Sequence, residues 1–434
     1  MLKRKIDTFL KTFYERNNKA LLLTGARQVG KSFSIREYGS KNYESYIEIN
    51  FITTPSAKNI FKDVQSTKEA ILRLSAFADK PLVKGSTFIF FDEVQECPEA
   101  VTYIKFLVEE GSYRYALSGS LLGVEMTDLR SAPVGYMSIK EVYPLDLEEF
   151  MMATSINNQI IEHVKESWQS KKSVDSVIHD KLMSVFRLYL LIGGMPESVN
   201  TYLATNDFNE VITTQKSIIN LYKMDISKYD KRNKIKISDI FDLIPPELNA
   251  KNKRFILKNL NQNAKFNSVE DLFLWLKYAG VALPVYNVEE PKEPLILSRS
   301  RNLFKLFQND VGLLAAQYAD GIQFRVLSGD SDINYGAIYE NAVAQELHAH
   351  GFPLYYYNSK KQGELDFIVD SEGYVLPIEV KSGKSYDRHR ALNNIMDNPA
   401  YTIPNALVLC NDNLYVEDKI LYAPIYMMMC LQKK

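Results

Sequence analysis

The chain has 434 residues, of which 46% are hydrophobic and 24% charged, and its formal net charge is -1. This composition is typical of a folded globular protein of about three domains, and the near-zero charge excludes binding of nucleic acid or membranes through overall charge alone. The three cysteines show no metal-ligand spacing and no apolar run is long enough for a membrane span, so we expect a protein of the reducing cytosol.

Residues 1–150 alternate between short β-rich runs and helical patterns, which predicts an α/β fold with a parallel sheet covered on both faces. The apolar run Ala20–Thr24 leads into a segment that fits the phosphate-binding pattern G-x-x-x-x-G-K-[ST] at every fixed position. In such a loop, backbone N–H groups surround the phosphates, the lysine reaches the β- and γ-phosphates, and the serine binds Mg²⁺. We therefore predict that ATP and Mg²⁺ bind at Gly25, Ala26, Arg27, Gln28, Val29, Gly30, Lys31 and Ser32.

Two adjacent acids, Asp92 and Glu93, end the next strongly apolar run, Thr87–Asp92. Parallel strands deliver such residues to the sheet edge where ligands bind, so Asp92 is predicted to hold Mg²⁺ and Glu93 to accept a proton from the attacking water. The run Arg114–Ser118 ends in a hydroxyl group, which suits a sensor of the γ-phosphate. An ordinary strand followed by a turn explains Ser118 equally well.

These motifs resemble the phosphate loop, Asp-Glu pair and sensor hydroxyl of the AAA-type P-loop ATPases, and the resemblance implies ATP hydrolysis. Relatives often carry Gly-Arg where this chain has Gly135 and Tyr136, so an arginine finger is not expected there, and Arg130 is the nearest alternative. More narrowly, nearly the whole chain resembles a prokaryotic AAA ATPase family with a C-terminal domain of unknown function. The matching segments are Phe91–Gln95, Leu117–Ser120, Tyr143–Leu145, Gly193–Pro196 and Asp310–Leu314.

Residues 151–235 are expected to be helical, with a turn at Gly193–Pro196. Residues 236–310 combine three short helical patterns with a β-like segment, which suggests a winged helix. Two basic runs in this part of the chain can contact the phosphates of DNA or RNA, although a solvated surface is the favoured interpretation. They contain Lys228, Lys231, Arg232, Lys234 and Lys236, and then Lys251, Lys253, Arg254 and Lys258.

Residues 363–381 predict two short strands around a turn. Asp366 opens the first strand, and Glu379 and Lys381 share one face of the second because side chains alternate along a strand. Paired carboxylates suit Mg²⁺, and a neighbouring lysine can position a water molecule. Solvated charges on a hairpin also satisfy this loose pattern, yet charge on one face of an apolar strand is costly unless it has a use.

This spacing resembles the PD-(D/E)XK nuclease superfamily, and Glu340, in the expected helix 335–348, matches the acid that these folds often bring from their first helix. Domains of this kind can lose their chemistry and keep binding. His348 and His350 are two residues apart on the same helix, so their side chains diverge, and we interpret them as surface residues rather than metal ligands.

The sequence thus predicts a P-loop ATPase domain (1–150), a helical segment (151–235), a winged-helix-like domain (236–310) and an α/β nuclease-like domain (311–434). In the leading hypothesis, ATP controls what the C-terminal half does to DNA or RNA. The alternative is an ATP-switched protein-interaction module with an inactive nuclease fold, and an oligomer is compatible with either. The predicted catalytic residues are Glu93, Asp366, Glu379 and Lys381, and the predicted metal ligands are Ser32, Asp92, Glu340, Asp366 and Glu379.

Overall fold

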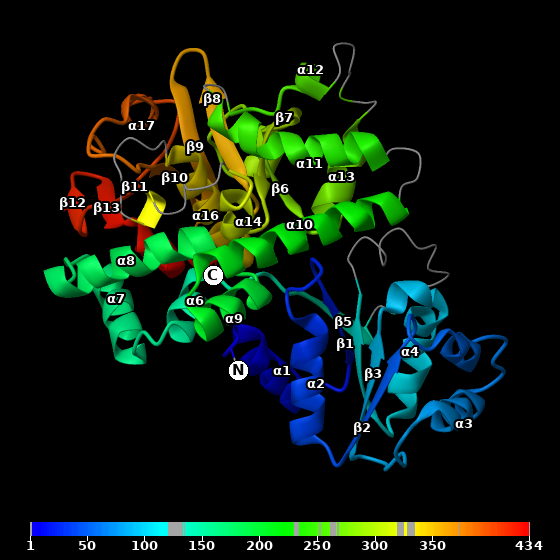
Figure 1. The fold of residues 1–434 in the computed structure, drawn as a ribbon. Coiled ribbons are helices and arrows are strands. Elements are labelled where there is room, and N and C mark those ends of the chain that lie inside the picture. Colours follow the sequence, from blue (N-terminus) through cyan, green and yellow to red (C-terminus); the bar gives the residue numbers. More distant parts are fainter. Residues whose placement is uncertain are drawn as a thin grey trace. The chain divides into compact units, whose positions relative to one another are not determined.

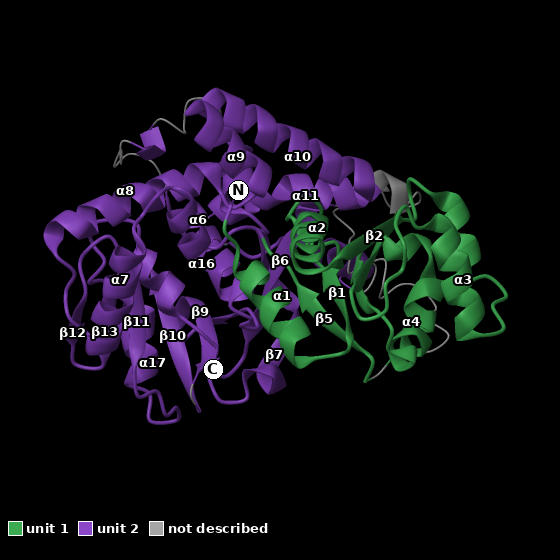
Figure 2. Cartoon of the chain, turned by 90° about the horizontal axis from the view of Figure 1, so that it is seen from below, with its two compact units in different colours: residues 1, 3–143, 278–280 green, residues 2, 144–277, 281–434 purple. Residues whose placement is uncertain are grey.

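The computed structural model describes residues 2–119, 133, 135–229, 234–250, 253–260, 266, 269–318, 325–327, 335–371 and 373–433. The chain forms two compact units (Figure 2). The first unit contains residues 3–143 and 278–280, and the second contains residues 144–277 and 281–434. Within the described ranges, no helix is long and apolar enough to cross a bilayer.

The first unit is built on one parallel sheet. Its strands are β1 (Ala20–Thr24), β2 (Ser45–Asn50), β3 (Thr87–Asp92), β4 (Arg114–Ser118) and β5 (Met137–Glu141). Its helices are α1 (Lys5–Arg16), α2 (Lys31–Asn42), α3 (Thr67–Phe77) and α4 (Pro98–Glu110), with 3-10 turns η1 (Pro55–Ile60) and η2 (Val94–Glu96). The strand order is β2-β3-β4-β1-β5, and every neighbouring pair is parallel. Figure 1 shows α1 and α2 on one face and α3 and α4 on the other, which confirms the predicted α/β architecture.

Burial along these strands follows their place in the sheet. All residues of the interior strands β1 and β3 are buried, whereas residues of the edge strand β2 alternate between buried and half-buried. Continuous apolar runs are typical of parallel strands with helices on both faces. Parallel pairing then brings the ends of β1, β3 and β4 to one edge of the sheet, where polar residues follow the apolar core.

The second unit combines helices with a mixed sheet of eight strands. The helices are α6 (Leu147–Ala153), α7 (Asn158–Ser170), α8 (Ser176–Ile192), α9 (Pro196–Thr205), α10 (Phe208–Tyr229), α11 (Lys234–Asn249), α12 (Leu257–Leu260), α13 (Glu270–Tyr278), α14 (Val311–Ala315), α16 (Gly336–Ala349) and α17 (Arg390–Met396), with 3-10 turns η4 (Leu295–Ser298) and η5 (Ile425–Cys430). The strands are β6 (Ala282–Val288), β7 (Arg299–Gln308), β8 (Tyr355–Ser359), β9 (Gly363–Ser371), β10 (Tyr374–Val380), β11 (Ala406–Cys410), β12 (Tyr415–Glu417) and β13 (Ile420–Pro424). Their order is β12-β13-β11-β10-β9-β8-β6-β7.

The hairpin of β6 and β7 differs from the winged helix that we expected in residues 236–310. β6 pairs in parallel with β8, so the hairpin extends the sheet that also contains β9 and β10. Nearly all of β6 is buried, whereas a wing with one face in solvent would alternate between buried and exposed residues. Strands from both sides of residue 310 therefore belong to one sheet.

A buried aspartate joins two segments that carried the family resemblance, Gly193–Pro196 and Asp310–Leu314. Oδ2 of Asp310 accepts a hydrogen bond from the backbone N–H of Gly194 (2.6 Å), and Oδ1 accepts one from Leu313 (3.0 Å). Nε2 of Gln345, on α16, also donates to Oδ2 (3.3 Å). Burial raises the pKa of Asp310 to about 6, and these hydrogen bonds oppose the rise by stabilising the carboxylate.

Gly193→Ala should destabilise the second unit strongly. Gly193 has a φ of 70°, and an added methyl group would clash with Oδ1 of Asp310. Gly351→Ala is a control for a glycine with positive φ, because its φ is 80° and nothing lies within 4 Å of the added methyl group. Gly193 also has a ψ of -165°, a conformation that almost only glycine adopts, so backbone strain adds to the clash there. Overpacking costs about 1–3 kcal/mol, so urea unfolding should show a loss larger by that amount at Gly193. Equal losses of unfolding free energy in the two variants would show that the close approach of Asp310 to residue 193 does not contribute to stability.

Candidate functional site

The loop between β1 and α2 contains the segment predicted to bind ATP. Gly25 and Gly30 have positive φ values of 128° and 97°, which side chains rarely allow. A methyl group at Gly25 would also clash with the backbone oxygen of Val142. Gly30 is the N-cap of α2, so the loop ends at a helix N-terminus, where the helix dipole and the terminal N–H groups attract anions.

Arg4 holds this loop from the N-terminal side of the chain. Its Nη1 donates to the carbonyl oxygen of Val29 (3.0 Å), and its Nη2 donates to that of Tyr143 (2.8 Å). Tyr143 is the last residue of the first unit's main segment. One guanidinium group therefore connects the phosphate-binding loop to the point where the chain leaves the first unit.

Lys31 lies inside the loop and is available for a phosphate. Its Nζ donates to the carbonyl oxygens of Gly25 (2.9 Å) and Ala26 (2.7 Å). Burial lowers the pKa of Lys31 to about 8, while the charges of Glu93 and Asp92 act in the opposite direction. Lys31 thus lies close to both acids of the predicted site, and nucleotide phosphates would offer it stronger acceptors than backbone carbonyls.

Asp92 is the centre of the hydrogen-bond network at this edge of the sheet, and it is buried. Its Oδ1 accepts from Oγ of Ser32 (2.8 Å) and, in a very short hydrogen bond, from Oγ of Ser118. Its Oδ2 accepts from Nδ2 of Asn50 (3.0 Å) and lies 3.5 Å from Nη2 of Arg36. The structure therefore brings the three predicted residues together and adds Asn50 and Arg36. The position of Asn50 at the end of β2 was the signal in the sequence that we missed.

A hydroxyl and a carboxylate oxygen at 2.8 Å, beside a phosphate-binding loop, are a donor set that fits Mg²⁺. Ser32 and Asp92 would hold the ion.

Glu93, directly after β3, has a strained backbone. Its φ of 59° and ψ of 48° are left-handed, a conformation uncommon outside glycine and often found at functional sites. Nε2 of Gln95 donates to Oε2 of Glu93 (2.5 Å). Gln95 therefore positions the acid that we predicted to be the general base, a role that the sequence alone did not indicate.

The C-terminal candidates form a second cluster, within the second unit. Glu340 lies on α16, Asp366 on β9, Glu379 on β10, and Lys381 directly after β10. Nζ of Lys381 lies 2.6 Å from Oε1 of Glu379, and Oδ2 of Asp366 accepts a hydrogen bond from the backbone N–H of Val380 (2.9 Å). Burial, followed by the charge of Asp366, raises the pKa of Glu379 to about 8 and also raises that of Glu340. The charge of Asp366 therefore acts on both Glu340 and Glu379.

Two further lysines balance the charge of this cluster. Lys253 forms a short ion pair with Glu340, and the fully buried Lys305, on β7, lies 2.7 Å from Oε1 of Glu364 and 3.7 Å from Oε2 of Glu340. In this arrangement Glu340, Asp366 and Glu379 do not bring three oxygens within 4.8 Å of one another. Oε2 of Glu340 and Oε2 of Glu379 are buried without a hydrogen bond. The neighbouring ammonium groups already neutralise much of the charge of these acids.

The lysines of the two basic runs lie in different environments. Lys236 and Lys258 are exposed, as a solvated surface requires. Lys253 instead pairs with buried Glu340, so it contributes to the carboxylate cluster rather than to a surface. Several candidates lie outside the described residues, namely Arg130, Lys231, Arg232 and Lys251.

Comparison with known families agrees with the geometry of the first site, because residues 17–151 match the model of an AAA domain. This part of the chain is an AAA-type, P-loop ATPase-like domain. Residues 183–323 and 335–427 match two domains of unknown function, DUF8612 and DUF4143. No curated protein matches the chain.

Solved structures with related architecture include a Walker-type ATPase of Pyrococcus abyssi, PABY2304, at 15% identity. The match covers 73% of this chain and 96% of that one, with a TM-score of 0.43. The Orc1 protein of Aeropyrum pernix, solved in complex with DNA, matches at 11% identity over 76% of this chain and 93% of that one. The RuvB Holliday junction branch migration motor of Thermotoga maritima matches at 11% identity over 70% and 92%. Both of these have a TM-score of 0.30.

Lys31→Ala should weaken ATP binding at least tenfold, because the variant lacks the ammonium group that faces the β- and γ-phosphates. The wild-type affinity should also fall between pH 7 and pH 9, since free Lys31 loses its proton with a pKa of about 8 and the bound phosphates require the charged form. Calorimetry at several pH values measures both effects. Lys58→Ala, which removes a partly exposed lysine of the same unit, should bind like wild type. Unchanged affinity in Lys31→Ala would contradict the assignment.

Proposed function

We propose that the chain is a Mg²⁺-dependent ATPase whose nucleotide state controls a nuclease-like C-terminal domain directed at DNA or RNA. The convergence of Ser32, Asn50 and Ser118 on Asp92, beside Lys31, carries the ATPase part of this proposal. The buried cluster around Glu340, Asp366, Glu379 and Lys381 supports the nuclease-like part.

ATP hydrolysis follows from the roles of a few side chains. Ser32 and Asp92 would hold Mg²⁺, which would supply positive charge at the β- and γ-phosphates, and Lys31 contributes its ammonium group there from the loop. Glu93 accepts a proton from the water that attacks the γ-phosphorus, and the bond to the β–γ bridging oxygen breaks. Gln95 keeps the Glu93 carboxylate in place. Ser118 is poised to sense the γ-phosphate, because its hydroxyl bonds to the Mg²⁺-binding acid.

The C-terminal cluster has the groups that hydrolysis of a phosphodiester needs. Asp366 and Glu379, with Glu340, would hold a divalent ion that supplies charge stabilisation, and Lys381 would orient a water molecule. The buried oxygens of Glu340 and Glu379 without hydrogen bonds support an ion there.

Charge balance favours a second candidate function, a binding module without cleavage. Lys253 and Lys305 pair with the same acids that an ion would need, so the cluster is stable without one. In that case the domain would serve an ATP-switched interaction with a protein. Nucleic-acid affinity that falls steeply with salt favours the first function, and binding of one protein partner that is insensitive to salt favours the second.

Glu93→Gln should retain ATP but stop its turnover, since an amide cannot accept the proton of the water. We expect phosphate release to fall at least a hundredfold, with an ATP affinity close to that of wild type. Glu96→Gln is the control, because Glu96 is a nearby exposed acid paired with Lys58. Release at the parent rate in Glu93→Gln would show that another group is the base.

Asp366→Ala should abolish any Mg²⁺- or Mn²⁺-dependent cleavage of DNA or RNA by the full chain, tested with and without ATP. Asp397→Ala, which removes an exposed acid of the same unit, should leave cleavage intact. Titration with Mn²⁺ separates the two candidate functions, because binding that needs Asp366 without cleavage supports the interaction module. A chain that shows neither cleavage nor Asp366-dependent ion binding contradicts the nuclease-like assignment.

A further inference from the structure

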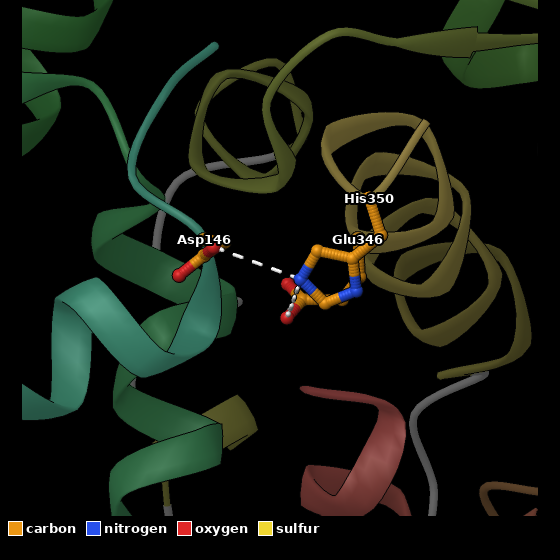
Figure 3. A group of neighbouring side chains, drawn as sticks. All are labelled: Asp146, Glu346 and His350. Carbon is orange, nitrogen blue, oxygen red and sulfur yellow. Dashed lines mark ion pairs between the residues drawn. The ribbon is translucent and has the colours of Figure 1, made fainter. Parts of the chain in front are cut away.

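A second group of potential metal ligands lies within the second unit, apart from the cluster around Glu340. Asp146 directly precedes α6, and Glu346 and His350 lie at the C-terminal end of α16 (Figure 3). One ligand atom from each residue lies within 4.8 Å of the other two. The side chain of His350 is only 4% exposed, so our interpretation of His350 as a surface residue was wrong.

Each of the three side chains is held by a backbone group outside the cluster. Oδ1 of Asp146 accepts from the N–H of Glu149 (2.9 Å), and Oε2 of Glu346 accepts from the N–H of Leu147 (3.1 Å). Nδ1 of His350 lies 2.5 Å from the carbonyl oxygen of Leu431, so Nδ1 carries the proton. Nε2 of His350 faces Oδ2 of Asp146 and Oε1 of Glu346, and Nε2 of Gln432 also lies 3.4 Å from it. Oε1 of Glu346 is buried and has no hydrogen-bond partner among the described residues. Histidines that bind metals are usually oriented in this way, by a hydrogen bond from the other ring nitrogen.

The distances inside the cluster leave room for an ion between the three side chains. Nε2 of His350 lies 3.6 Å from Oδ2 of Asp146 and 3.5 Å from Oε1 of Glu346. Charge-assisted hydrogen bonds between nitrogen and oxygen measure about 2.7–2.9 Å, which is clearly shorter. Two ligands of a tetrahedral Zn²⁺, each about 2.0–2.1 Å from the ion, are separated by roughly 3.3 Å. The two distances from Nε2 of His350 are therefore close to the edges of a tetrahedral site, and all three ligand atoms lie within 4.8 Å of one another.

We propose that Asp146, Glu346 and His350 bind one Zn²⁺ ion, with the fourth position taken by water. The mixture of imidazole and carboxylate favours Zn²⁺ over Mg²⁺, which prefers oxygen ligands alone. The ion would fasten the N-terminus of α6 to the end of α16, and through His350 to Leu431 near the C-terminus. Because α16 also carries Glu340, this ion would hold the helix from which one acid of the other cluster projects.

The test uses the full chain without a histidine tag, stripped with a chelator and then titrated with Zn²⁺. Wild type should bind one ion per chain in this site, and His350→Gln and Asp146→Asn should lose at least tenfold in affinity. His163→Gln is the control, because His163 is exposed on α7. Zn²⁺ should raise the thermal midpoint of wild type and of the control but not of the two variants. Co²⁺ at the site should show d–d absorption without the thiolate charge-transfer band that cysteine ligands would give.

Equal Zn²⁺ affinity in wild type, His350→Gln and Asp146→Asn would overturn the proposal. So would a wild type that binds no Zn²⁺ and a His350→Gln variant that only loses stability, since that result indicates an imidazolium held between two carboxylates. If circular dichroism shows that the variants do not fold, we would test the proposal by anomalous diffraction from wild-type crystals grown with Zn²⁺. An anomalous peak among the three side chains supports the site, and a peak elsewhere or none refutes it.

Discussion

A carboxylate that is taken out of water must receive hydrogen-bond donors or a cation, and this requirement shapes every site described above. Leaving such a group uncompensated costs several kcal/mol, on the order of the whole stability of a domain. Asp92 receives two hydroxyl groups and an amide, and Asp310 receives backbone N–H groups. Glu340 receives lysines instead. The charge of these partners determines how readily each acid can bind a metal ion.

The hydroxyl and amide partners of Asp92 carry no charge, while Nη2 of Arg36, 3.5 Å from Oδ2, neutralises part of the charge of this carboxylate. The hydroxyl oxygen of Ser32 beside it is itself a ligand for Mg²⁺, so this site keeps its capacity to attract the ion. In the C-terminal cluster, the four acids Glu340, Glu364, Asp366 and Glu379 already face three ammonium groups, those of Lys253, Lys305 and Lys381. A divalent ion must compete with these groups. The site at Asp92 and the C-terminal cluster therefore differ in how strongly they would attract a metal ion, despite their similar residue types.

The nucleotide site was predictable because its motif is contiguous and because parallel strands must end at a common edge. Lys305 was not predictable, since it enters the cluster from β7, and nothing local in residues 299–308 states which sheet that strand joins. The same missing information led us to expect a winged helix. His350 was misjudged for another reason. A spacing of two residues shows that two helical side chains diverge, but α16 is buried on nearly all sides, so divergence does not imply exposure.

The double hydrogen bond of Arg4 has a mechanical consequence. Nucleotide that tightens the phosphate-binding loop must either displace the carbonyl of Tyr143 together with that of Val29 or break one of the two bonds. Residue 144 begins the second unit, so the displacement is applied directly to the connecting backbone. Thermodynamic linkage makes the effect reciprocal. A movement at Tyr143 would therefore reach the carbonyl of Val29 through the same guanidinium group.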